Sequence, residues 1–141
     1  MIVEIKEYSP EIHHFVCRLI RQLTPNRKDL SEPAFRAILD SDNVCLFVIH
    51  DDNETPVGML TTGVYRTPTG YKAWIEDVVV DDKHRGFGYG KIIVEHAIAY
   101  LRGLGVDTIS LTTNSTRVAA NQLYRSLGFE LYETNVYRIR L

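Results

Sequence analysis

The chain has 141 residues, a formal net charge of −2, 45% hydrophobic and 24% charged residues. This length suits one domain, with a core large enough to be stable without disulfide bonds or a structural metal ion. We therefore expect a single domain over residues 1–141. The slight acidity gives no electrostatic support for nucleic-acid binding. No apolar run approaches the roughly 18 residues of a membrane span, and the N-terminus lacks a signal-peptide core. We therefore expect a cytoplasmic protein.

Cysteine and histidine patterns indicate no metal centre. The two cysteines, Cys17 and Cys45, lie in a helical and a strand pattern respectively and have no metal-ligand spacing. We interpret both as buried free thiols. The five histidines also show no paired spacing, so the sequence predicts no metal.

The N-terminal third predicts one strand and two helices. Residues 2–8 alternate in polarity, which is a weak strand signal. Ser9 followed by Pro10 is typical of a helix start, and apolar residues at helical spacing predict a helix over 10–23. Ser31 is the expected cap of a second, shorter helix that ends near Leu39.

The middle of the chain predicts a meander of three strands. They cover residues 44–49, 56–66 and 71–81, and short turns rich in Asp, Asn, Pro and Gly separate them. Such short connections imply antiparallel pairing.

The C-terminal half alternates helices and strands. We expect a helix from the glycine-rich turn to Arg102, a strand over 108–112, a helix over 116–127, and strands over 129–132 and 135–141. In the last strand Tyr137, Ile139 and Leu141 alternate with arginines. The order β-α-α-β-β-β-α-β-α-β-β predicts an α/β sandwich around one mixed sheet, with helices on both faces.

One stretch, Trp74 to Lys91, carries the strongest functional signal. A β-branched strand that contains Glu76 and Asp77 leads into a turn with Gly86, Gly88 and Gly90, and a helix follows. The first N–H groups of a helix have no intrahelical acceptor and favour anions. Glycine allows close approach and a positive φ. We interpret residues 85–91 as a pyrophosphate cradle; the alternative is a tight turn that binds nothing.

The spacing of the glycines excludes two familiar nucleotide motifs. A P-loop needs four residues between its glycines and a Ser or Thr after its lysine, and the dinucleotide fingerprint is Gly-x-Gly-x-x-Gly. Neither is present. The pattern Arg-x-x-Gly-x-Gly, formed by Arg85, Gly88 and Gly90 after a Glu-bearing strand, resembles the acetyl-CoA site of the GNAT superfamily of N-acetyltransferases.

A second segment supports the resemblance. Residues 121–129, Asn-Gln-Leu-Tyr-Arg-Ser-Leu-Gly-Phe, are similar to the family's Asn-x-x-Tyr-x-x-x-Gly-Phe segment. Arg117, Asn121 and Tyr124 are spaced i, i+4 and i+7 and so share one helix face. The resemblance covers Trp74 to about Tyr137 and implies a GNAT-like fold with acetyl-CoA as co-substrate.

The resemblance also implies roles for individual residues. Glu76 is the candidate base, with positioning and structural roles as open alternatives, and Tyr124 is the candidate acid. A backbone N–H at Val78 would stabilise the carbonyl oxygen, and Val80 would bond the pantetheine arm. The expected cofactor-binding residues are Val78, Val79, Val80, Arg85, Gly86, Phe87, Gly88, Tyr89, Gly90, Lys91, Asn121 and Tyr124. On strand alternation alone, Glu76 and Asp77 should face opposite ways, unless a bulge intervenes.

The acceptor and the assembly are less defined by the sequence. The Glu76-Asp77 pair looks like family members that act on small amines or amino sugars; a protein lysine or N-terminus is the alternative acceptor. A CoA-binding sensor without turnover and, more weakly, a nucleotide-binding domain are rival functions. A terminal strand at a sheet edge would leave unpaired backbone groups, so we also expect a homodimer.

Overall fold

A computed structural model describes all residues, 1–141, and shows one five-stranded sheet in the order β1-β2-β3-β4-β5. Neighbouring strands are antiparallel except β4 and β5, which are parallel. The strands are β1 (Ile2–Ile5), β2 (Val44–His50), β3 (Pro56–Thr67), β4 (Gly70–Val80) and β5 (Thr108–Ser110). The helices are α1 (Pro10–Leu23), α2 (Glu32–Leu39), α3 (Tyr89–Gly103) and α4 (Val118–Ser126), with a 3-10 turn η1 (Asp82–His84).

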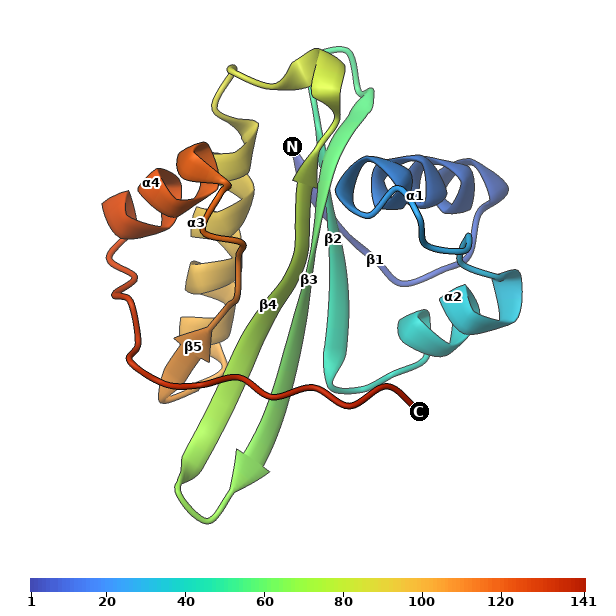
Figure 1. Cartoon of the computed structure of the whole chain (residues 1–141). Helices are drawn as coiled ribbons and strands as arrows, with labels where there is room; N and C mark the ends of the chain where they lie inside the picture. Colours follow the sequence, from blue (N-terminus) through green and yellow to red (C-terminus); the bar gives the residue numbers. More distant parts are fainter.

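Helices cover both faces of this mixed sheet, as the sequence predicted. Figure 1 shows α1 and α2 on one side and α3 and α4 on the other. The predicted caps are confirmed: the Ser9 hydroxyl accepts the Ile12 N–H at 3.2 Å, and the Ser31 hydroxyl accepts the Ala34 N–H at 3.3 Å.

Two apolar clusters hold the three layers together, one on each face of the sheet. Along β2, Phe47 and Ile49 belong to the cluster on the α3 side, and Leu46 and Val48 belong to the cluster on the α1 side. Burial on both faces explains why β2 is a continuous apolar run.

A β-bulge interrupts β4 just after Glu76. Glu76 pairs with Thr61 and Val79 with Met59, so β4 has one residue more than β3 between these pairs. Asp77 takes a positive φ of 52° at this point. As a result Ile75 is buried on the α3 side, whereas Val79 is buried on the α1 side. The simple alternation expected across Glu76 and Asp77 therefore fails, and both side chains are exposed.

The prediction of two C-terminal strands is wrong in this structure. Residues 129–141 form no helix or strand, and most of their large apolar side chains are exposed, Leu131 by 86% and Tyr137 by 89%. An alternating pattern shows that a segment can pair, but a strand forms only when a partner supplies hydrogen bonds. Figure 1 shows this tail as an extended coil that ends at the C-terminus without joining the sheet. We call residues 130–141 the C-terminal tail.

Candidate active site

The site begins where β4 and β5 separate. Only residues 72–74 of β4 pair with β5, so the second half of β4 has no sheet neighbour on that side. The Asp81 N–H donates to the Val57 carbonyl at 2.8 Å. Because antiparallel ladders alternate their hydrogen bonds, the amide of Val80 points away from β3 and toward the gap. The Val80 N–H can bind a ligand only if β4 and β5 separate, and the structure shows this separation.

A pocket of about 140 Å³ lies in this gap. Residues 75–78 of β4 form one wall, and Leu111 and Thr112 extend it beyond β5. Tyr124 and Arg117 line it from α4 and its N-terminus, and Leu23 reaches it from the end of α1. The pocket thus brings the two predicted catalytic residues, Glu76 and Tyr124, to one cavity.

The environment of Glu76 favours its protonated form more than water does. Partial burial and the negative charge of Asp77 raise the pKa of the Glu76 carboxyl, and the positive charge of Arg138 in the C-terminal tail opposes this shift. The raised pKa brings the carboxylate closer to the range useful for general base catalysis. The bulge contributes to the shift because it leaves the two adjacent carboxyl groups lining the same pocket.

Tyr124 is buried, with 7% of its surface exposed. Burial raises the pKa of its phenol, and the charge of Arg117 acts in the opposite direction. The ring packs in the α3-side cluster and meets Phe129 edge-on, with 5.9 Å between ring centroids. Because its pKa is raised, the phenol is protonated at neutral pH. The hydroxyl makes no hydrogen bond within the chain, so it can donate one to a ligand.

The glycine turn leaves a run of unbonded amides at the start of α3. No N–H from Gly86 to Lys91 has an acceptor in the chain; the first helical bond there runs from the Ile92 N–H to the Gly88 carbonyl at 3.1 Å. Gly86 and Gly88 have φ of 86° and 85°, which L side chains rarely adopt. The backbone is thus held in a shape that exposes consecutive donors, as a phosphate cradle requires.

The side chains of this turn have distinct surroundings. The Arg85 Nε donates to the Val80 carbonyl at 3.1 Å, which fastens the turn to the end of β4. Lys91 is exposed and lies 4.0 Å from Glu95. Phe87 is also exposed and faces Tyr89 with 6.4 Å between ring centroids.

Two other predicted cofactor residues have partners inside the fold. Val79 does not line the pocket, and its side chain is buried against α1. The Asn121 Nδ2 donates to the carbonyls of Asn114 and Arg117, at 3.0 and 2.8 Å. Asn121 therefore braces the loop before α4, and its Oδ1 is its free polar atom.

Sequence reasoning did not identify several residues of the pocket wall. Leu23, Leu111 and Thr112 have no signal beyond helix or strand periodicity, because they reach the pocket only through tertiary packing. Arg117 did have a signal, since it shares a helix face with Tyr124, but no role was assigned to it.

A protein-family model described as the acetyltransferase (GNAT) family matches residues 13–129. The chain belongs to this family. The resemblance inferred from the glycine turn and the Asn121–Phe129 segment is thereby confirmed, as is the GNAT-like α/β fold.

Individual relatives agree with this assignment. The chain is 32% identical over 93 residues to the mycothiol acetyltransferase of Thermobispora bispora. The aligned region covers 64% of this chain and 32% of that protein. It is 34% identical over 64 residues to the streptothricin acetyltransferase of Streptomyces lavendulae. This alignment covers 42% of this chain and 34% of that protein. The chain thus spans about a third of the length of these relatives.

Solved structures match over the whole chain. A putative acetyltransferase from Agrobacterium tumefaciens has a TM-score of 0.85 at 27% identity, with 100% of this chain and 99% of that chain covered. An aminoglycoside acetyltransferase from an uncultured soil metagenomic sample, at 21% identity, shares the fold with a TM-score of 0.85, over 100% and 95% of the two chains. Separately, none of the helices is both long and apolar enough to cross a bilayer.

Proposed function

We propose that the protein is an acetyl-CoA-dependent N-acetyltransferase acting on a small-molecule amine. The observation that carries this proposal is the pocket between β4 and α4. It places a carboxyl group of raised pKa, Glu76, and an unbonded phenol, Tyr124, in one cavity. The unbonded amides of the glycine turn follow β4 in sequence, so one continuous segment carries both Glu76 and the turn.

The residues of the turn fit the cofactor. The free N–H groups of residues 86–91 would bind the pyrophosphate of CoA, and the gap beside Val78 and Val80 would admit the pantetheine arm. Acetyl-CoA would supply the acetyl group as a reactive thioester.

Three residues of the pocket would then each have a chemical task. Glu76, directly or through a water molecule, would take the proton from the acceptor amine. The Val78 N–H would stabilise charge on the carbonyl oxygen. Tyr124 would donate its proton, or a hydrogen bond, to the departing thiolate, because an ordinary phenol has a higher pKa than a thiol and burial raises the pKa of Tyr124 further.

The pocket supports an amine acceptor, and the relatives favour a small one. Two adjacent carboxyl groups on the wall of the pocket of about 140 Å³ would attract an ammonium group. Relatives named for mycothiol, streptothricin and aminoglycoside acetylation are consistent with small acceptors.

The test is thiol release from acetyl-CoA during incubation with amines. The panel would contain amino sugars, aminoglycosides, polyamines, a lysine peptide and a peptide with a free N-terminus. Turnover of at least one small amine is expected, with the peptides unreactive. Turnover of a peptide alone would overturn the acceptor class. CoA binding without thiol release from any amine would favour a sensor module, and stronger binding of ATP than of CoA would favour a nucleotide-binding domain.

A further inference from the structure

One buried carboxylate outside the pocket has no place in this chemistry. Asp81, directly after β4, is 2% exposed and is one of two buried polar residues in the chain; the other is Thr62. Burying a carboxylate is costly unless it is paired and hydrogen-bonded. Its partners therefore indicate what its burial achieves.

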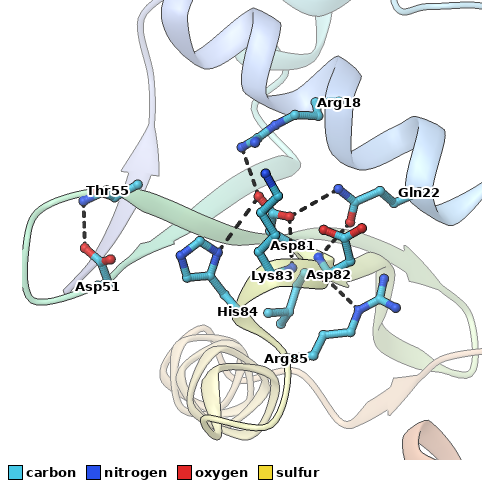
Figure 2. Close-up of polar contacts among 10 residues, drawn as sticks. Arg18, Gln22, Asp51, Thr55, Asp81, Asp82, Lys83, His84 and Arg85 are labelled. Carbon is cyan, nitrogen blue, oxygen red and sulfur yellow. Dashed lines mark hydrogen bonds and ion pairs between the residues drawn. The ribbon is translucent and has the colours of Figure 1, made fainter.

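Those partners come from two separate parts of the fold (Figure 2). From α1, the Arg18 Nη2 lies 3.1 Å from Asp81 Oδ2, and the Gln22 Nε2 donates to Asp81 Oδ1 at 3.3 Å. From the turn itself, the Lys83 N–H donates to Oδ1 at 3.4 Å, and His84 Nδ1 lies 3.9 Å from Oδ2. Asp81 thus joins α1 to the segment that leads into the glycine turn.

Gln22 strengthens this junction from the α1 side. Its Oε1 accepts the Asp82 N–H at 2.9 Å while its Nε2 donates to Asp81. Arg18 and Gln22 are four residues apart and so lie on one face of the helix. One helix face therefore contacts both Asp81 and the first residue of η1.

The far end of the same short segment is also fastened. After η1, Arg85 returns to the Val80 carbonyl at 3.1 Å. Residues 80–85 therefore form a braced corner with Asp81 at its inner side, and the unbonded amides of residues 86–91 follow it immediately. The corner is thus the last fastened part of the chain before those amides.

We propose that Asp81 is a positioning residue for the cofactor turn: its carboxylate ties α1 to the corner before α3 and so aims the backbone donors of residues 86–91. This inference rests on the proposed use of that turn for CoA. It assigns to Arg18 and Gln22 a supporting part in cofactor affinity, although neither lines the pocket. Because backbone donors that point in another direction bind the pyrophosphate less well, loosening the corner should weaken CoA binding measurably.

The primary test is Asp81→Asn in the full-length protein. The substitution keeps the shape of the side chain but removes the charge that pairs with Arg18. We expect the Kd for CoA, measured by isothermal titration calorimetry, to rise about tenfold or more. The KM for acetyl-CoA should rise in parallel, while kcat at saturating acetyl-CoA changes less than about threefold, since the pocket residues are untouched.

Asp29→Asn is the matched control. Asp29 also pairs with an arginine of α1, Arg21, but this pair is exposed and its hydrogen bonds involve no residue of the turn. The control should leave CoA affinity and kcat near wild type. A purely structural role for Asp81 would lower Tm without changing the Kd for CoA in the folded variant, and that result would overturn the inference.

Gln22→Leu keeps the inference testable if Asp81→Asn does not fold. It removes the hydrogen bonds to Asp81 and to the Asp82 N–H but leaves the Arg18 pair. A smaller rise in the Kd for CoA is expected, and unchanged affinity in a folded Gln22→Leu protein would overturn the inference. If wild-type protein itself does not bind CoA, the proposed function fails first. If wild type binds and both folded variants bind equally well, the positioning role alone fails.

Discussion

Glu76 on β4 and Tyr124 on α4 line one pocket because β4 and β5 stop pairing after Trp74 and Ser110. The two side chains are far apart in sequence. Continued pairing of the strands would have closed the gap between them. The site therefore depends on a sheet that opens at one end as much as on the residues themselves.

Tyr124→Phe should separate binding from chemistry. The ring packs in the α3-side cluster and the hydroxyl makes no hydrogen bond within the chain, so we expect Tm and the Kd for CoA to stay near wild type. Loss of a general acid should lower kcat by about a hundredfold or more. Single-turnover kinetics with acetyl-CoA and the preferred amine would measure this. A wild-type rate for the chemical step would exclude Tyr124 as the acid.

The pH dependence of kcat/KM should report Glu76. Burial and the charge of Asp77 raise the pKa of Glu76, so the activity should fall as the pH drops through that raised value and the base becomes protonated. Glu76→Gln should remove this acidic limb as well as lower the rate. A limb that persists unchanged in Glu76→Gln would leave Glu76 with a positioning or structural role.

Asp77→Asn tests the cause of the same shift. Removing the neighbouring negative charge should lower the pKa of Glu76, so the acidic limb should move to lower pH while the plateau rate stays comparable. A shift toward higher pH would contradict the electrostatic explanation.

Gly88→Ala should damage the cofactor turn. Gly88 has a φ of 85°, and forcing an L side chain into this conformation costs roughly 1–2 kcal/mol. We expect a lower Tm and a higher Kd for CoA. Gly103→Ala is the matched control, because Gly103 lies in the last turn of α3 without a positive φ and with no atom within 4 Å of an added Cβ. There the substitution should be neutral or stabilising by up to about 1 kcal/mol.

The C-terminal tail predicts association between copies of the chain. Its alternating apolar residues are exposed, and β5 is an edge strand with one neighbour. In a two-fold symmetric dimer, the tail of each copy could pair with the β5 edge of the other copy, so that both β5 edges would be covered. Light scattering over a dilution series should give twice the 16.1 kDa of the monomer. Arg138→Glu with Arg140→Glu should shift the equilibrium toward monomer; a wild-type monomer at tens of micromolar would contradict the prediction.

Features that depend on residues close together in the chain could be predicted from the sequence. Ser9 and Ser31 begin helices because a hydroxyl can accept an N–H three residues later. Three other features also follow from nearby residues. They are the continuous apolar run of β2, the positive φ of Gly86 and Gly88, and the helix face that Arg117 and Tyr124 share. These signals sufficed for the family. They also singled out Glu76 and Tyr124, which the structure brings to one pocket; their catalytic roles stay predictions.

Features that depend on distant partners could not be predicted in this way, because they arise from contacts between separate elements of the fold. The bulge after Glu76 arises from pairing with β3, and the gap at Val80 arises from the divergence of β5. The burial of Asp81 requires Arg18 and Gln22 from α1. The alternation in the tail predicted strands that the structure does not contain. Whether a strand forms depends on a partner edge, and periodicity carries no information about which edge is available.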